Sequence, residues 1–239
     1  GRNGTPGDGS AKVELADSLE AVGISVNPRV QALYAQVGEG KLMDLVASDG
    51  EVEFDGEKYE VTPERCYGYA DKKWGRGFTS PWVWLSSSDL FSNLTGKALK
   101  NSVFDIGGGQ PKVAGISLGR QLLSAFYYEG REFEFNFSKP ALFTQTRFDC
   151  GETETEIRWH VSQTSAYGKM ETRISCPKSE MLFMNYEAPD GSMPLKRLWN
   201  GGTGKGRIKL YGRDDDGKLF LVDDIRAEHV GCEYGERCK

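Results

Sequence analysis

The sequence lacks several features that define large functional classes. It contains no apolar run approaching the roughly 18 residues of a transmembrane helix, so we expect no transmembrane segment. Its polar start, GRNGTPGDGS, holds neither the apolar core of a signal peptide nor an initiator methionine, and a processed or trimmed chain is expected. The net charge of −5 and the isoelectric point near 5.3 give no general attraction to phosphates, although a local basic patch stays open. Nucleic acid is therefore not an expected partner.

Residues that hold metals or perform nucleophilic catalysis are also scarce. The five cysteines form no CxxC pair and show no zinc-type spacing with the two histidines, His160 and His229. No GxSxG elbow is present, and both histidines lie in strand-like runs without a nucleophile beside them. We therefore expect no metal site and no cofactor. The odd cysteine count leaves a free thiol, a Cys150–Cys176 bridge between neighbouring strands stays open, and the compartment is not determined.

Two glycine-rich motifs imitate nucleotide-binding loops and are interpreted otherwise. In NGGTGKGR, residues 200–207, the first glycine of a phosphate loop would fall on Trp199, and Gly206 replaces the Ser or Thr that would bind magnesium. We expect a glycine-rich turn there, with a β-bulge, before the strand RIKLYG. DIGGGQPK, residues 105–112, precedes an alternating run and no helix, so a loop is expected. The acidic run 214–216 lacks the distal glutamate of a calcium loop and favours a solvated loop.

The sequence does contain a clear change of hydrophobic period. The first ten residues are glycine-rich and polar, and we expect them to be mobile. Two short helical patterns follow at 11–23 and 27–38, each ending at a glycine cap. From about Leu42 onward, hydrophobic and polar residues alternate in short runs, which is typical of strands. We therefore divide the chain into 1–41, a flexible start with short helical segments, and 42–239, a β domain.

Glycine pairs mark the turns between these alternating runs. Asp55-Gly56 lies between EVEF and EKYEV and suits a type I′ hairpin turn. Similar units recur around three further pairs, which are Glu129-Gly130, Asp190-Gly191 and Asp216-Gly217. More than a dozen antiparallel strands are expected, and they must close or stack to hide their edges. We therefore predict an all-β fold, an antiparallel β-barrel of the ligand-enclosing kind with short N-terminal helices.

The stretch from Gly68 to Ser88, GYADKKWGRGFTSPWVWLSSS, combines three tryptophans with a cluster of ionisable residues. Within it, YGYADKKWG followed by FTSPWVWLSSSDL resembles the signature of the tocopherol cyclase family, and the preceding GEVEFDGEKYEV resembles a hairpin of that family. The similarity continues more weakly through FYYEGREFEF and IRWHVS to GCEYG, and spans roughly Leu42 to Gly235. A more distant likeness joins this group to carotenoid hydratases. The resemblance implies a lipocalin-like β-barrel that holds a prenylated, largely apolar ligand.

The resemblance also implies roles for individual residues. To close a chromanol ring, an enzyme protonates an alkene, stabilises the tertiary carbocation, and lets a phenol oxygen attack it. Asp71 is the candidate proton donor, because burial raises the pKa of a carboxyl group, and Lys72 is the candidate residue that supports it. The candidate substrate-binding residues are aromatic, since their π-faces attract a cation: Tyr69, Trp74, Trp82, Trp84 and Tyr127.

Two departures separate this sequence from the family pattern. Asp71 stands where the plant enzymes have Glu, and Lys73 stands where they have Asn. The resemblance also implies that the family's β-rich N-terminal part is shortened or missing here, because the signature begins by residue 69. We therefore expect, besides a hydrophobic small-molecule ligand, association with a missing N-terminal portion or a second chain, and transient membrane contact for ligand uptake.

Three function classes stay open. The first is a cyclase that acts by acid catalysis on a prenylated or polyene substrate. The second is a noncatalytic lipocalin-like carrier of a hydrophobic ligand, and the third is a structural module whose barrel is filled by its own side chains. The classes differ in what the barrel interior holds and in whether an acid faces the ligand. An Asp71–Lys72 ion pair that closes one end of a barrel would fit the third class.

Overall fold

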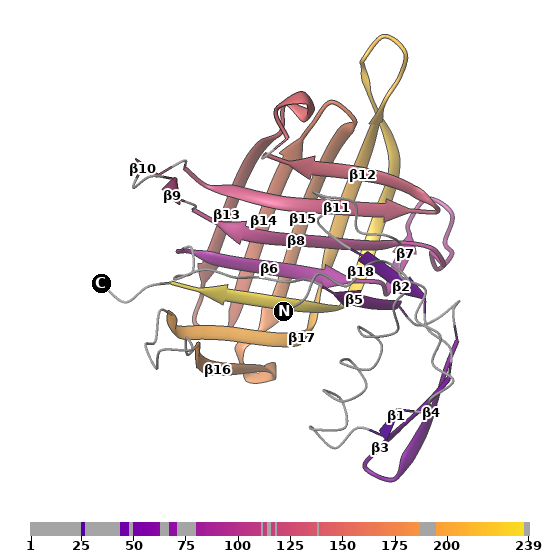
Figure 1. The fold of residues 1–239 in the computed structure, drawn as a ribbon, viewed down its shortest axis with the longest axis vertical. Helices are drawn as coiled ribbons and strands as arrows, with labels where there is room; N and C mark the ends of the chain where they lie inside the picture. The colour runs from indigo at the N-terminus through magenta and orange to yellow at the C-terminus, as the bar shows by residue number, and fades with distance from the viewer. Residues whose placement is uncertain are drawn as a thin grey trace, which may run out of the picture. The chain divides into compact units, whose positions relative to one another are not determined.

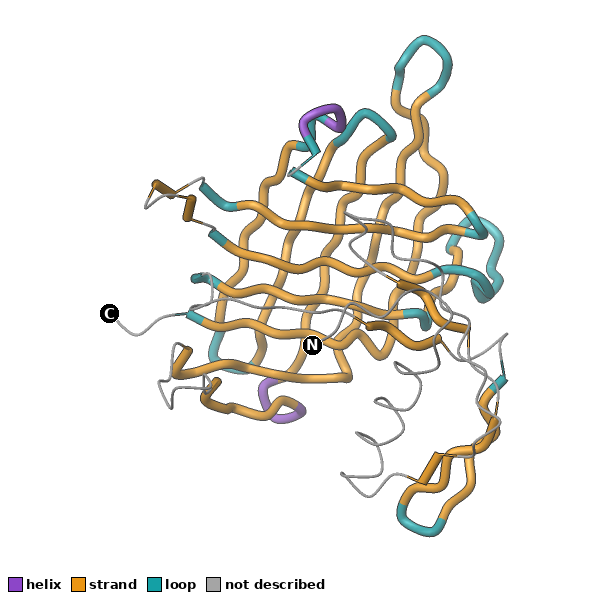
Figure 2. The backbone as a smooth tube through the Cα atoms, in the orientation of Figure 1, coloured by secondary structure: helices purple, strands orange, loops and turns teal. Residues whose placement is uncertain are grey.

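Figures 1 and 2 show the computed structural model of the chain. The chain divides into two compact units, Gly1–Lys73 and Trp74–Lys239. The structure describes these residues: 25–26, 44–47, 50–62, 67–70, 80–110, 112–113, 116–117, 119–137, 139–186 and 195–236. The predicted mobile start and the predicted helices at 11–23 and 27–38 lie outside the described residues. In the described part of the chain, no helix has the length and apolar character that a membrane span requires.

In its described residues, the first unit contains five short strands in two small sheets. They are β1 Ser25–Val26, β2 Asp44–Ala47, β3 Gly50–Phe54, β4 Glu57–Val61 and β5 Tyr67–Ala70. β1, β3 and β4 form one sheet in that order, and β2 pairs with β5 in another. Between β3 and β4, Asp55 and Gly56 have φ values of 52° and 79°. Positive φ at both central residues is the requirement of a type I′ turn, so the hairpin prediction is confirmed.

The second unit is built on one 11-stranded antiparallel sheet. Its order is β12-β11-β8-β6-β18-β17-β15-β14-β13, with β16 paired to β17 and β7 paired to β18. The strands are β6 Trp82–Ser87, β7 Leu90–Ser92, β8 Val103–Gly109, β11 Gln121–Tyr128, β12 Arg131–Asn136, β13 Gln145–Glu152, β14 Glu156–Thr164, β15 Gly168–Pro177, β16 Met181–Tyr186, β17 Leu195–Arg213 and β18 Leu219–Gly235. A separate short pair, β9 Lys112–Val113 and β10 Ile116–Ser117, and two 3₁₀ turns, η1 Pro140–Leu142 and η2 Lys178–Glu180, complete the described elements of this unit.

Two long strands connect the two layers of this sheet. In Figure 1, β12, β11, β8 and β6 cross in front of β13, β14 and β15, and β17 and β18 continue from one layer into the other. β18 pairs with β7 at Ile225–Ala227 and with β6 at Gly231–Gly235. Between these two segments, His229 has a φ of 44°. The predicted antiparallel, barrel-like all-β fold is therefore confirmed.

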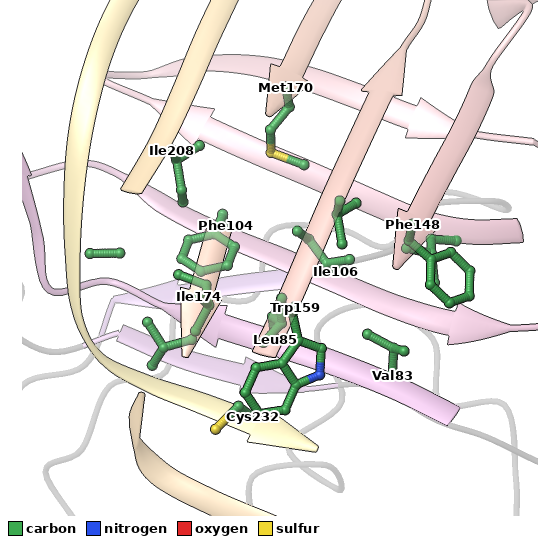
Figure 3. Packing of buried hydrophobic residues seen from close by; sticks show 14 of the residues in the cluster. Val83, Leu85, Phe104, Ile106, Phe148, Trp159, Met170, Ile174, Ile208 and Cys232 are labelled. Atoms are coloured by element: carbon green, nitrogen blue, oxygen red, sulfur yellow. The ribbon is translucent and has the colours of Figure 1, made fainter. Parts of the chain in front are cut away.

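Apolar side chains from both layers fill the space between them. Figure 3 shows Leu85 and Phe104 from one layer close to Trp159 and Ile174 from the other. The buried cluster includes residues that expose no surface at all, among them Leu85, Phe104, Ile106, Leu122, Phe126, Phe133, Phe135, Ile157, Val161, Ile208, Leu210 and Ile225. A side chain without any exposed surface has no water-sized void beside it. Where the sequence predicted a ligand-enclosing barrel, the interior around these residues is a packed core.

The glycines of both motifs lie in strands, at 105–109 within β8 and at 200–207 within β17, so the loop predictions for these residues are wrong. Residues 200–207 lie within β17, and the register of β17 on β18 shifts at Gly201/Gly204 and at Gly204/Gly206. The pairing is therefore irregular where the bulge was predicted. At Gly206 a Cβ atom would lie 1.9 Å from the carbonyl oxygen of Arg173 on β15, so only glycine allows this close approach. In the other motif, Gly108 has a φ of 139° within β8, which also favours glycine.

The other turn predictions can be compared with the structure in part. Glu129 and Gly130 have φ values of 44° and 85° and connect β11 to β12 as predicted. The acidic run 214–216 is exposed in the turn between β17 and β18, where Gly217 has a φ of 75°. β16 and β17 pair as the predicted hairpin requires, while the turn around Asp190-Gly191 lies outside the described residues.

Three cysteines in the described part carry free thiols, at Cys150, Cys176 and Cys232. Cys150 lies on β13 and Cys176 on β15, and β14 runs between them. Two strands separated by a third are about 9–10 Å apart, which is beyond the reach of a disulfide. The Cys150–Cys176 bridge considered from the sequence is therefore wrong. Burial raises the pKa of the Cys150 thiol to about 12, so it is a poor nucleophile at neutral pH.

Candidate functional site

The two tryptophans of β6 share the face of the sheet that is turned away from the packed core. Successive side chains of a strand point to opposite faces. Val83 and Leu85 belong to the core, so Trp82 and Trp84 project from the other side. There they form a separate small hydrophobic cluster with Leu198 of β17. Trp82 is 7% exposed and Leu198 is completely buried, whereas Trp84 is partly buried.

Glycines on the neighbouring strands leave room for the indole of Trp84. Trp84 lies opposite Gly107 of β8 and opposite Glu233 of β18. A Cβ atom at Gly107 would lie 3.6 Å from Cδ1 of Trp84, and one at Gly231 would lie 3.0 Å from its six-membered ring. The indole therefore lies across β6, with its ends above positions that carry no side chain.

Each indole N–H donates a hydrogen bond to a carboxylate on a neighbouring strand. Nε1 of Trp84 donates to Oδ1 of Asp105 at 2.9 Å, and Nε1 of Trp82 donates to Oε2 of Glu233 at 2.5 Å. Nδ2 of Asn200, on β17, donates to Oε1 of Glu233 at 2.9 Å. We call these five residues, Trp82, Trp84, Asp105, Asn200 and Glu233, the tryptophan–carboxylate face.

The two carboxylates differ in their surroundings. Asp105 is only 2% exposed although it lies on the face opposite the core residues Phe104 and Ile106. Glu233 is partly buried, and both of its oxygens accept hydrogen bonds from neutral donors. In the described part of the chain, Glu233 makes no ion pair with Lys, Arg or His. Both oxygens of Glu233 are thus satisfied by neutral donors, and the face combines aromatic rings with carboxylate groups.

The structure places only some of the residues predicted from the sequence. Trp82 and Trp84 lie together, and Tyr127 of β11 lies on the same face as Asp105, because Ala125, two residues before it, pairs with Asp105. Tyr69 lies on β5 of the first unit and pairs with Leu45. Asp71, Lys72 and Trp74 lie outside the described residues. Their predicted roles therefore stay predictions.

A second polar group lies on the core side of the same layer. Tyr128, next to Tyr127, donates from its hydroxyl to Oδ2 of Asp223 at 3.0 Å, and Ser92 donates to Oδ1 of Asp223 at 2.8 Å. Burial, together with Asp223, raises the pKa of Tyr128 to about 12. The Tyr128 hydroxyl therefore keeps its proton at neutral pH, and its hydrogen bond to Asp223 links β11 to β18.

Sequence reasoning missed Asp105, Asn200 and Glu233. Asp105 and Asn200 belong to the two glycine-rich motifs that were interpreted as loops, and Glu233 lies in GCEYG near the end of the chain. An interpretation of these motifs as strands would have allowed alternation to assign each residue to a face. The pairing of the strands, which brings the three residues to Trp82 and Trp84, has no local signal in the sequence. In the described residues, no group of three or more His, Cys, Asp or Glu side chains could hold a metal ion.

Comparison with known proteins gives one result. A family model described as tocopherol cyclase-like matches residues 36–235. The matched range contains both the predicted signature and the whole tryptophan–carboxylate face. No curated protein matches this chain. No solved structure matches it either.

Proposed function

This chain belongs to the tocopherol cyclase-like family, and we propose that it binds a hydrophobic prenylated or polyene small molecule and promotes its acid-catalysed cyclisation. The single observation that carries the proposal is the tryptophan–carboxylate face. The partly exposed indole of Trp84 offers apolar surface to a prenyl chain, and the carboxylates beside the two indoles favour positive charge on that chain. We place the ligand on this face, because the interior around the buried hydrophobic cluster is a packed core.

The reaction conserves protons overall. An acid donates a proton to a trisubstituted alkene, and the tertiary carbocation forms at the more substituted carbon. The phenol oxygen attacks this carbon, a C–O bond closes the ring, and the phenolic proton leaves to the conjugate base of the acid. Asp71 is the predicted donor from the sequence, with Lys72 as its predicted support. The residues of the face would bind the chain and stabilise the cation.

Tryptophan fluorescence tests ligand binding. Geranylhydroquinone and a panel of polyenes are titrated into the protein, and a saturable quench or shift is expected. Trp84→Ala should lose most of the response, because it removes the ring that lies across β6. Trp199→Phe is the matched control. It also removes one tryptophan, but the Trp199 ring lies tilted by 46° against Phe183, with ring centroids 4.5 Å apart, and packs against the core cluster.

Product analysis then separates an enzyme from a carrier. Wild-type protein is incubated with each ligand that binds, and the products are identified by mass spectrometry after extraction. A cyclised product, formed faster than without protein, supports the enzyme. Saturable binding without any turnover would support the noncatalytic carrier of the second function class. A panel without saturable binding would contradict both and leave the structural module.

A further inference from the structure

We propose that Cys176, Met181 and Cys232 form a binding site for a soft monovalent metal ion, Cu(I), which we call the sulfur site. All three residues belong to the buried core cluster, with exposed fractions of 0%, 9% and 0%. The site therefore lies on the side of the sheet opposite to the tryptophan–carboxylate face. The inference is independent of the proposed cyclisation.

Strand pairing brings the three side chains to one short segment of β17. Met181 of β16 and Cys232 of β18 both pair with Gly201, from opposite edges of β17. Cys176 lies near the end of β15, which pairs with the same edge of β17 as β16 does. The ligands thus come from three strands around a fourth, and no short spacing motif in the sequence marks them.

Glycines of β17 leave the space in which the sulfur atoms meet. A Cβ atom at Gly201 would lie 3.2 Å from Sγ of Cys176. It would also lie 3.0 Å from Cγ and 3.4 Å from Cε of Met181, the two atoms bonded to the thioether sulfur. A Cβ atom at Gly204 would lie 3.3 Å from Sγ of Cys232. Burial, and then the neighbouring Cys176, raise the pKa of the Cys232 thiol, so the two thiols are close enough to interact.

The separation of the two cysteines suits a bridging metal ion better than a disulfide. Cys176 and Cys232 lie on strands that β17 separates, and such strands are about 9–10 Å apart. A disulfide needs Cα atoms within about 7 Å of each other. Two metal–sulfur bonds of about 2.3 Å each supply the additional length. The pair can therefore hold an ion between its sulfurs without a large movement of the strands.

The chemistry of the ligands selects the metal. Thiolate and thioether sulfurs are soft ligands, which favour Cu(I). A structural zinc site takes four ligands, and the described residues contain no group of three or more His, Cys, Asp or Glu side chains that could hold a metal ion. Each metal–thiolate bond that forms replaces one S–H bond, and the proton leaves to solvent. The bound ion links β15, β16 and β18 across β17.

Competition with the chelator bathocuproine disulfonate, under anaerobic conditions, measures Cu(I) binding. The full-length chain used as parent carries Cys66→Ser and Cys238→Ser, because these two cysteines lie outside the described residues. We expect one Cu(I) per chain to withstand the competition. The ion should also raise the temperature of thermal unfolding, since the site exists only in the folded chain. One equivalent of Zn(II) should leave that temperature unchanged.

Substitutions in this parent assign the binding to the three sulfurs. Cys176→Ser and Cys232→Ser should each lower the Cu(I) affinity at least about 100-fold, because each removes a thiolate ligand. Met181→Leu keeps the volume and removes only the thioether, so a loss of about tenfold is expected. Cys150→Ser is the matched control, because Cys150 is also a free thiol but lies on β13. Its affinity should match that of the parent.

X-ray absorption at the copper edge of the parent protein decides the question if the serine variants do not fold. A coordination shell of sulfur alone supports the site, whereas nitrogen or oxygen ligands would overturn it. Equal losses of affinity in Cys150→Ser and Cys176→Ser would also overturn it, since binding would then not depend on the position of the thiol. Failure of the folded parent to retain one Cu(I) would do the same, and the proposed cyclisation would stand unaffected.

Discussion

At the scale of single residues, glycine determines where the tryptophans of the face can lie. Trp84 has Gly107 on one side and Gly231 on the other, and a side chain at Gly231 would contact its ring at 3.0 Å. A ring held between two strands in this way has few alternative rotamers. Its N–H then reaches Asp105 without further adjustment. The two glycines therefore help to fix the position of the Trp84 ring, although neither contributes a side chain to the face.

Asp71 is the predicted proton donor, and its substitution tests this role. Burial would raise the pKa of the Asp71 carboxyl, whereas an ammonium group at Lys72 would lower it, and each effect can reach several units. If burial dominates, the group keeps its proton near neutral pH. Asp71→Asn keeps the shape and removes the acid, so turnover of a verified substrate should fall by at least about 10²-fold with little change in ligand affinity.

Two other results would contradict this role of Asp71. Near-normal turnover in Asp71→Asn would exclude it as the donor. Equal losses of binding and folding would identify a structural ion pair with Lys72, and a thermal unfolding curve of the variant separates this case from loss of chemistry alone.

The candidate site could be predicted from the sequence only in part. Trp82 and Trp84 were found because tryptophans are rare and alternation places two of them on one face. Glu233 was not found, because it is 151 residues away from Trp82 in the chain. Its place beside the indole depends on the register between β6 and β18. Register is determined by the packing of whole strands and by bulges, which no single residue reports.

At the scale of elements, the glycines of β17 allow one strand to pair on both sides and to bend. Turn residues flanked by alternating runs predicted the hairpins correctly, because Asp55-Gly56 and Glu129-Gly130 need positive φ. The glycines of residues 200–207 are required for a different reason. Gly206 is required by the carbonyl of Arg173 on the neighbouring strand, and this contact is not visible in the sequence.

Gly206→Ala should therefore be strongly destabilising. A Cβ atom there would lie 1.9 Å from the carbonyl oxygen of Arg173, so β15 or β17 must move. We expect a loss of about 3 kcal/mol or more in the free energy of unfolding, measured by urea denaturation. Gly202→Ala is the matched control in the same strand, because a Cβ atom there meets nothing within 4 Å. Its effect should stay within about 0.5 kcal/mol. Equal stability of the two variants would contradict the close approach of β15 and β17.

At the scale of the second unit, the packed core and the tryptophan–carboxylate face lie on opposite sides of one sheet layer. The sequence predicted the barrel because its many short strands need closed or covered edges. It did not predict the filled interior, since alternation gives the same pattern for a packed core and for a ligand cavity. Stability and ligand affinity should therefore depend on different residues.

A pair of substitutions tests this separation. Phe126 is completely buried and stacks on Phe104 with ring centroids 6.1 Å apart, so Phe126→Leu should cost about 1–2 kcal/mol in the free energy of unfolding. Because the ligand is proposed to bind on the other side of the layer, the Kd of geranylhydroquinone should change by less than about threefold. Trp84→Phe should raise that Kd by at least about tenfold, since it removes ring surface and the bond to Asp105. Calorimetric titration measures the Kd of both variants, and urea unfolding measures the free energy of unfolding of both. A larger loss of affinity in Phe126→Leu than in Trp84→Phe would place the ligand between the layers, as in a ligand-enclosing barrel.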